Sequence, residues 1–169
     1  MRVFRLLVLI SFFSIVTATT FKELSMANML EQSQIAFHGE VISSEVIDKQ
    51  GEPWTKVKFK ILKSLLGLKD QKEVSLLFYG GYLDGKSVSV SLMPQFYESE
   101  KVIILAYKQE YYSPIVGFNQ GLWREQTLGL VDENGHILSL EDGELVLNGE
   151  GAGTNDVLQA FEKAFEGKK

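Results

Sequence analysis

The sequence predicts a mainly β domain, and two observations carry that prediction. Short apolar runs with strand periodicity recur along the chain, and glycine-containing turns separate them. Three such runs follow one another in the segment 73–108, split by Gly80-Gly81 and then by the corner at 94–100. Apolar residues make up 45% of the 169 residues and aromatic residues 11%. That composition is sufficient for a hydrophobic core in one domain.

The first residues are typical of an export signal. Arg2 and Arg5 precede an uncharged apolar run at 6–16. The residues that follow, up to Ala18, have the small-residue pattern that a signal peptidase cleaves. The run is well short of the roughly 20 residues that span a bilayer, which disfavours a retained membrane anchor. The sequence therefore predicts a signal peptide at 1–18 and a single domain at 19–169. We expect an exported protein, periplasmic or extracellular, without stable membrane insertion after cleavage.

Charge and cysteine content narrow the classes of partner and cofactor. Without residues 1–18 the chain carries 15 basic and 22 acidic residues, a net charge near −7. Nucleic acids and anionic membranes attract basic surfaces, so neither is expected as a partner. The chain has no cysteine, which excludes disulfides, thiolate nucleophiles and zinc–thiolate sites. We expect no cofactor and no metal. The expected partner is another exported protein, and the sequence leaves the oligomeric state open.

The sequence pattern predicts one helix and two strands in the first half of the domain. Helical spacing of apolar residues predicts a short amphipathic helix at 21–33. Period-two patterning predicts a strand at 35–47, where Gly39 suggests a bulge, and another at 54–62 after a turn at 48–52. The second strand alternates Val57, Phe59 and Ile61 with Lys56, Lys58 and Lys60. These lysines form either a stripe for an anionic ligand or a solvated strand face that discourages edge pairing. The acidic chain favours the second interpretation.

The sequence pattern predicts further strands, hairpins and a helix in the second half of the domain. The run 74–79 is apolar on both phases and should be covered on both sides, whereas 88–92 alternates with serines and should have one wet face. The run 102–107 should form a central strand. Asn-Gly and Asp-Gly pairs predict that 128–131 pairs with 136–140 and that 144–147 follows. A helix is predicted at 154–165, capped by Thr154 or Asn155 and ended by Gly167.

Catalytic motifs are weak in this sequence. His38 and His136 are the only histidines, and their spacing excludes the usual zinc-hydrolase motif. Either could serve as the base of a serine hydrolase, yet no serine lies in a Gly-x-Ser-x-Gly motif. The segment 132–135 resembles the start of a calcium loop with its glycine misplaced, so it is interpreted as a turn.

Aromatic residues beside turns provide the candidate contact surface. Tyrosine and tryptophan bring large contact area at little entropic cost and are enriched at interfaces. The alternative is that these rings complete or close the core. The candidate partner-binding residues are Tyr79, Gly80, Gly81, Tyr82, Phe96, Tyr97, Tyr111, Tyr112 and Trp123.

Several short segments, in order and spacing, resemble known families between residues 24 and 127. They are Ala36-Phe37-His38-Gly39-Glu40-Val41, Thr55, 63–67, Phe78-Tyr79-Gly80-Gly81, Pro94-x-Phe96-x-Glu98-x-Glu100-Lys101-Val102 and Val116-Gly117-x-x-Gln120-Gly121. This pattern resembles a group of uncharacterised bacterial exported proteins. It is also similar to the OB-type barrel of netrin-like domains and tissue inhibitors of metalloproteinases. The inhibitors chelate a protease's zinc through an amino-terminal cysteine. This chain has no cysteine, so that mechanism does not carry over.

The resemblance implies an OB-like barrel of five to seven strands, with a short helix before it and another at the carboxyl end. We expect an exported, non-enzymatic binding or interaction module. The resemblance to the inhibitor family implies that it is a partner or modulator of an exported protease. Two alternatives are a secreted hydrolase that uses His38 or His136, and a structural component of the cell envelope.

Overall fold

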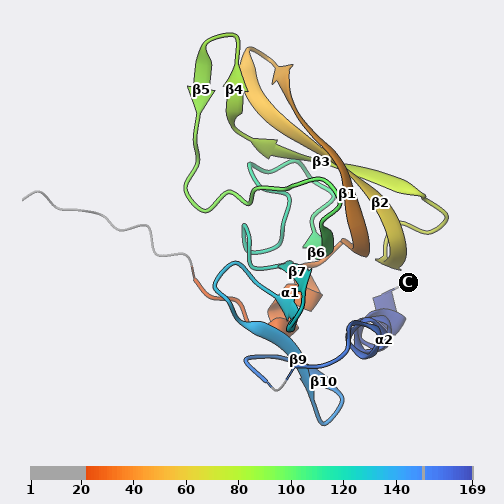
Figure 1. Cartoon of the computed structure of the whole chain (residues 1–169). Coiled ribbons are helices and arrows are strands. Elements are labelled where there is room, and N and C mark those ends of the chain that lie inside the picture. Colours follow the sequence, from red (N-terminus) through yellow and green to blue (C-terminus); the bar gives the residue numbers. More distant parts are fainter. Residues whose placement is uncertain (1–21, 150, 169) are drawn as a thin grey trace, which may run out of the picture.

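The computed structural model describes residues 22–149 and 151–168, so the predicted signal peptide lies outside the described residues. Strands dominate, which confirms a mainly β fold (Figure 1). The elements are α1 (Met26–Gln32), β1 (Ile35–Lys49), β2 (Glu52–Leu66), β3 (Glu73–Tyr79), β4 (Gly81–Leu83), β5 (Lys86–Val88), β6 (Lys101–Ala106), β7 (Leu122–Gln126), β8 (Gly129–Val131), β9 (Ile137–Glu141), β10 (Glu144–Leu147), α2 (Thr154–Phe165) and a 3-10 turn (Glu166–Lys168).

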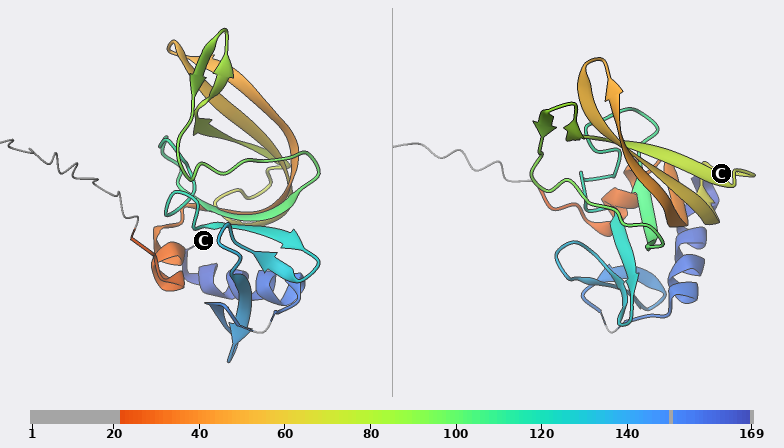
Figure 2. Two further views of the ribbon diagram at one scale, coloured as in Figure 1. Left: turned by 60° about the vertical axis from the view of Figure 1, so that its left-hand side comes forward. Right: turned by 45° about the horizontal axis from the view of Figure 1, so that its top comes forward.

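Eight of the strands form one antiparallel sheet in the order β10-β9-β8-β7-β6-β1-β2-β3. Strands β4 and β5 make a separate two-stranded hairpin. The long strands β1 and β2 curl through the upper part of the molecule, and the helices lie below with β9 and β10 (Figure 2). The two outermost strands, β3 and β10, do not pair with each other, so the sheet is open. The predicted OB-like barrel is therefore not shown by the strand pairing.

The curl of β1 has a local cause. Its pairing with β2 shifts register at three places, one of them between His38 and Gly39, which confirms the bulge predicted at Gly39. A Cβ at Gly39 would lie 2.8 Å from the Phe37 ring and 3.0 Å from the Lys60 carbonyl oxygen. Only glycine fits such an approach without a shift of its neighbours, and bulges of this kind bend and twist a strand.

The sheet separates two hydrophobic cores, and β6 contributes to both. Val102 and Ile104 face an inner core, enclosed by the curl of β1, β2 and β3. Ile103 and Leu105 face a helix core, which lies between the other side of the sheet and the two helices. All four side chains are fully buried. This confirms the prediction of a central strand at 102–107, because only a strand covered on both faces is apolar on both phases.

Other predictions for the elements are confirmed in the same way. Both predicted helices form: the first, predicted at 21–33, is shorter and covers 26–32, and the second covers 154–165 as predicted. Strand β8 pairs with β9 and β9 with β10, as the Asn-Gly and Asp-Gly turns predicted. The lysines of β2 lie on the solvated face, where Lys56 pairs with Glu45 and Lys58 with Glu73. Strand β2 lies between β1 and β3, however, so these lysines do not protect a sheet edge.

Three predictions for the elements were wrong. Strand β3 is an edge strand and is not covered on both sides. Leu76 and Phe78 are buried on one face, whereas Leu77 and Tyr79 on the other face stay partly exposed. The strand predicted at 88–92 ends at Val88, and 89–100 forms an irregular loop that carries Phe96 into the inner core. The residue that caps α2 is Gly153, and no side chain caps that helix. Among the described residues, no helix is long and apolar enough to cross a membrane.

Candidate functional site

Three aromatic rings form a cluster outside both cores, and we call Trp54, Tyr79 and Tyr112 the aromatic cluster. The rings of Trp54 and Tyr79 meet edge to face with centroids 5.2 Å apart. Those of Tyr79 and Tyr112 are 4.7 Å apart, and those of Trp54 and Tyr112 are 6.3 Å apart. These distances lie in the range of favourable aromatic pairs. Tyr112 is 63% exposed, so the cluster reaches the surface.

Strand periodicity places two of these rings on the outer face of the sheet. Trp54 shares its phase with the lysines of β2, whereas Val57 and Phe59 point to the inner core. Tyr79 follows Phe78 on β3, so one ring points outward and the other inward. The register sets Trp54 opposite Tyr79 on adjacent strands. Cross-strand partners lie about 5 Å apart, close enough for ring contact.

Backbone hydrogen bonds fix the position of the cluster. The amide of Tyr79 donates to the carbonyl of Tyr112 at 2.8 Å, which anchors the loop after β6 to the end of β3. The amide of Gly80 donates to the carbonyl of Pro53 at 3.0 Å. The hydroxyl of Thr55 donates to the carbonyl of Gly80 at 2.8 Å. The rings therefore stand on fixed backbone, which lowers the entropic cost of contact with a partner.

Charged side chains of both signs surround the cluster. The Lys49 ammonium lies 4.5 Å above the Trp54 ring and 2.8 Å from the Glu110 carboxylate. On the other side, Lys86 donates to Glu52 at 2.6 Å, and this bond lowers the pKa of the Glu52 carboxyl. The Tyr79 hydroxyl also donates to Glu52, at 3.3 Å. Partial burial, with Glu52 next in effect, raises the pKa of that hydroxyl, so Tyr79 stays a neutral donor.

The aromatic cluster lines a shallow cavity of about 500 Å³. The cavity lies at the end of the sheet where β1 turns into β2. Volumes of roughly 300–1,000 Å³ are typical of ligand sites. An apolar or aromatic group of a partner could rest on the rings while its polar groups meet the surrounding charges. The lining residues are Lys49, Gln50, Glu52, Trp54, Tyr79, Glu110 and Tyr112.

The predicted contact glycines have a structural role. Gly80 is buried, and a Cβ there would lie 2.8 Å from the Val88 carbonyl oxygen. A Cβ at Gly81 would lie 2.8 Å from a methyl group of Val46. Both have positive φ, +112° and +136°, which side chains rarely adopt. These glycines let the β4–β5 hairpin fold back against β1 and β2, and they bring no contact group of their own.

The other predicted site residues do not join the aromatic cluster. Tyr82 and Tyr97 are each 68% exposed and lie elsewhere on the surface. Tyr111 is exposed and packs on Tyr107, with centroids 5.0 Å apart. The structure thus brings together Tyr79 and Tyr112 of the predicted set and leaves three tyrosines apart from them.

Phe96 and Trp123 are core residues, so the prediction that they form a contact surface needs correction. Phe96 lies in the inner core, 5.0 Å from the Phe78 ring and 5.4 Å from the Phe59 ring. Trp123 is fully buried in the helix core, 6.0 Å from the Phe161 ring. Both therefore follow the alternative interpretation, in which aromatic residues complete the core.

Sequence reasoning missed Trp54, although a signal for it was present. Trp54 is the one aromatic residue on the phase of the strand that Lys56, Lys58 and Lys60 occupy. A large aromatic residue on the polar phase of a strand is not needed for the core. Such a residue is a candidate for contact at the surface.

Each of the two histidines has a carboxylate neighbour. His38 Nε2 lies 3.5 Å from Glu125 Oε2 on the helix-core side, and burial lowers the pKa of His38 despite this carboxylate. His136 Nδ1 lies 3.1 Å from Asp132 Oδ2. Among the contacts of the described residues, neither imidazole forms a hydrogen bond with a serine or threonine hydroxyl, which a hydrolytic triad requires. The hydrolase alternative receives no support from these contacts.

Among the residues that the structure describes, the acidic turns do not assemble a metal site. Asp132 Oδ1 accepts hydrogen bonds from the amides of Asn134 and His136, both at 2.8 Å, which confirms the turn interpretation of 132–135. Within residues 22–149 and 151–168, no group of three or more His, Asp and Glu side chains could hold a metal ion.

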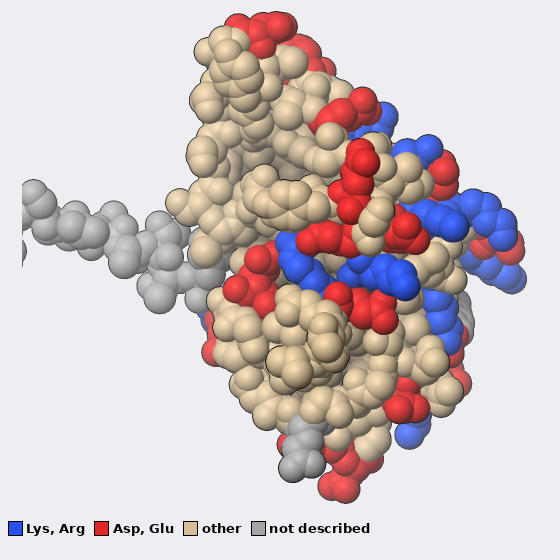
Figure 3. Space-filling model, viewed as in Figure 1, with Lys and Arg blue, Asp and Glu red and all other residues tan. Residues whose placement is uncertain are grey.

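Figure 3 shows acidic and basic side chains intermingled across the middle of one face, with few charges at the upper left.

Comparisons of the chain with protein-family models, with curated proteins and with solved structures found no match. The resemblance to exported bacterial proteins and netrin-like domains therefore stays a prediction.

Proposed function

We propose that this chain is an exported, non-enzymatic binding module and that it contacts a partner protein through the aromatic cluster. The observation that carries the proposal is the cluster itself: three rings pack together outside both cores, on fixed backbone, with Tyr112 63% exposed. Tryptophan and tyrosine are enriched among the residues that dominate binding energy.

The position of the cluster supports an OB-like mode of binding. Strands β1, β2 and β3 form an antiparallel meander, and β1 also pairs with β6. OB-type domains bind across the face of their second and third strands and the loop between their first two. Trp54 and Tyr79 lie on the outer face of β2 and β3, and Lys49 and Glu52 flank the β1–β2 turn. We accordingly propose that the curled part of the sheet is an OB-like unit.

The flanking charges suggest the chemistry of the partner. Two ion pairs, Lys49–Glu110 and Lys86–Glu52, flank the cluster, so charges of both signs lie at its rim. Such a rim favours a partner with an apolar or aromatic group at its centre and both signs of charge around it. The partner we propose is another exported protein.

Capture from the organism's exported proteins tests this proposal. The tagged chain is compared with the double variant Tyr79→Ala/Tyr112→Ala, and with Tyr97→Ala as a matched control. Tyr97 is an exposed tyrosine outside the cluster. We expect a partner that the natural chain and Tyr97→Ala both retain and the double variant loses. Equal retention by all three would overturn the assignment of the site.

A further inference from the structure

The edge of the sheet at β3 is open, and it leads into the aromatic cluster. Strand β3 is the last strand of the sheet, and among the described strands it pairs with β2 alone (Figure 1). Its final residue is Tyr79 of the cluster. The other edge strand of the sheet, β10, is four residues long and packs against both helices. Of the two edges, the one at β3 is therefore the longer and the less covered.

Backbone alternation shows which groups this open edge presents. The Tyr79 amide donates to the Tyr112 carbonyl, away from β2, whereas the next amide along the chain donates to β2. Amide and carbonyl groups of successive residues point to opposite sides of an antiparallel strand. Glu73, Ser75 and Leu77 therefore direct theirs away from β2, on the same side as the Tyr79 amide. Within the described chain no hydrogen bond reaches these groups, so each of the three residues offers one donor and one acceptor.

The usual protections of an edge strand are missing from β3. Proline, bulges and clustered charges normally prevent pairing at an edge. Strand β3 has seven residues, none of them a proline, and Glu73 is its only charged residue. Its register with β2 is unbroken over all seven residues, in contrast to the three shifts between β1 and β2. Glu73 and Ser75 are exposed, and Leu77 is half-buried. An edge of this kind accepts an extended segment of another chain as an added strand.

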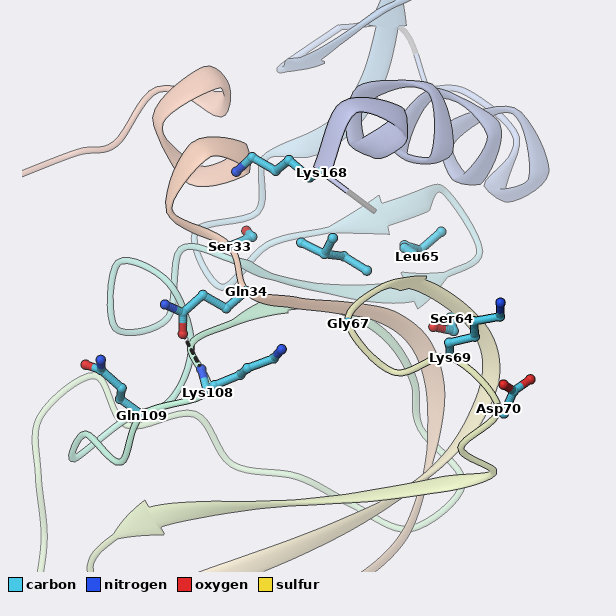
Figure 4. A pocket seen from close by; sticks show the side chains of 11 residues that line it. Ser33, Gln34, Ser64, Leu65, Gly67, Lys69, Asp70, Lys108, Gln109 and Lys168 are labelled. Carbon is cyan, nitrogen blue, oxygen red and sulfur yellow. Dashed lines mark hydrogen bonds between the residues drawn. The ribbon is translucent and has the colours of Figure 1, made fainter.

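The two ends of this edge differ in character, and together they indicate the chemistry of the segment. At the end of β3, Tyr79 joins the other two rings of the aromatic cluster. Around the start of β3, four lysines accompany two acidic residues, and Lys69 and Asp70 of this group lie on the connection from β2 to β3 (Figure 4). One of the two acids, Glu73, already pairs with Lys58. This end therefore favours acidic side chains in a partner. The charged residues here are Lys58, Lys60, Lys69, Asp70, Lys72 and Glu73.

We propose that the exported partner adds an extended segment to the open edge of β3, with an apolar or aromatic side chain on the aromatic cluster and acidic side chains at the start of β3. This inference rests on the proposed function and adds the form in which the partner binds. Main-chain hydrogen bonds along the edge hold the segment, and the rings set where it begins. The segment runs antiparallel to β3, because every strand pair of the described sheet is antiparallel and parallel pairing is less stable.

Synthetic peptides test the pairing, with amide hydrogen exchange in NMR spectra as the measurement. The probe is acetyl-Trp-Thr-Val-Thr-Val-Thr-Glu-Glu-amide, whose tryptophan lies at the cluster when the peptide runs antiparallel to β3. Two matched control peptides replace the tryptophan by alanine or carry N-methyl groups on the two central amides. The N-methyl groups remove main-chain donors and keep every side chain.

The alternation along β3 makes the expected result specific. Saturating probe should slow exchange about tenfold or more at the amides of Glu73, Ser75 and Leu77. The amides of Leu76 and Phe78 already face β2, so their exchange should stay unchanged. Both control peptides should bind about tenfold more weakly, since each lacks either the ring or the main-chain donors. No slowing at about 1 mM probe, or equal affinity for either control peptide, would overturn the proposal. Exchange that is already slow at these three amides in the free chain, and that speeds up on dilution, would place a second copy on the edge and overturn it as well.

Two substitutions of Ser75 carry the test to the partner protein. Ser75→Pro removes an amide that forms no hydrogen bond within the described chain, and edge strands accept proline where the amide faces solvent. Ser75→Ala keeps the amide and is the matched control. We expect Ser75→Pro to lose both the probe peptide and the captured partner, and Ser75→Ala to retain both. The amide spectrum shows whether each variant keeps the fold, and if Ser75→Pro does not, the N-methylated peptide decides.

The outcomes for this inference and for the proposed function are distinguishable. A partner that Tyr79→Ala/Tyr112→Ala loses but a folded Ser75→Pro retains would leave the aromatic cluster as the contact surface and overturn the pairing on β3. A partner that both of these variants retain would overturn both proposals.

Discussion

Phe78 and Tyr79 are neighbours on β3, yet their rings belong to different regions of the molecule. Phe78 is 1% exposed and packs with Phe96 in the inner core, whereas Tyr79 packs with Trp54 and Tyr112 at the surface. The same division occurs on β2 between Phe59 and Trp54. One strand therefore supplies rings that hold the fold on one side and rings that are free for contact on the other. Substitutions on the two sides should have opposite consequences for stability and for binding.

The largest loss of stability is expected in the inner core. Phe59 is fully buried and meets the rings of both Phe37 and Phe96. Phe59→Ala removes this packing and leaves a cavity, and such changes cost about 3–5 kcal/mol. Urea denaturation measures the free energy of unfolding. A loss below about 1 kcal/mol would contradict the burial of this ring.

A smaller loss is expected where the β4–β5 hairpin folds back. Gly81→Ala combines the rare φ of +136° with the close approach to Val46, and strained backbone of this kind costs about 1–3 kcal/mol. Gly51→Ala is the matched control, because Gly51 also has positive φ, +80°, but nothing lies within 4 Å of its Cβ. Urea denaturation should show a greater loss for Gly81→Ala than for Gly51→Ala. Equal losses would show that the contact with Val46 contributes nothing.

The helix-core side of the sheet should add a pH-dependent effect. His38 follows Phe37 on β1 and faces Glu125, with Lys101 and Lys63 nearby. Burial lowers the pKa of His38 in the folded state below its ordinary value of 6.5, so in the unfolded chain the imidazole binds a proton at higher pH. His38 therefore destabilises the fold as the pH falls through 6.5 and toward the lowered folded-state value, and it has no such effect well above 6.5.

The variant His38→Gln isolates this effect from the titration of the carboxylates. Between pH 7.5 and 5.5, urea denaturation should show a larger loss of stability for the natural chain than for His38→Gln. Between pH 8.5 and 7.5 the difference between the two proteins should stay constant. Parallel profiles over the lower interval would contradict burial as the dominant influence on this imidazole.

The smallest effect on stability is expected in the aromatic cluster. Tyr112 is 63% exposed and lies outside both cores, so Tyr112→Ala should change the free energy of unfolding by about 0.5–1 kcal/mol at most. The same measurement on Phe59→Ala provides the contrast. A loss comparable to that of Phe59→Ala would mean that the cluster holds the fold together, and it would remove the reason to assign it a binding role.

The sequence predicted local patterns well and long-range arrangement less well. The central strand, the bulge at Gly39 and the carboxyl-terminal hairpins follow from periodicity and turn chemistry, which act between near neighbours. The edge position of β3 and the loop that carries Phe96 into the core depend on contacts between distant segments.

The same limit applies to the site. Tyr79 and Tyr112 come together because the loop after β6 hydrogen-bonds to the end of β3, and no local pattern encodes that bond. Trp54 joins them through strand register, for which its place on the lysine phase was the only sign. The sequence could thus propose aromatic contact residues, whereas their grouping required the fold.

The central claim is that the aromatic cluster is where a partner binds, and site-specific photo-crosslinking tests it most directly. A benzophenone amino acid replaces Tyr112 in one sample and Tyr97 in another, and each is irradiated with the organism's exported proteins. We predict that the probe at position 112 forms an adduct with the protein that the natural chain captures, while the probe at position 97 forms none. Adducts of that protein at position 97 but not at position 112 would contradict the account.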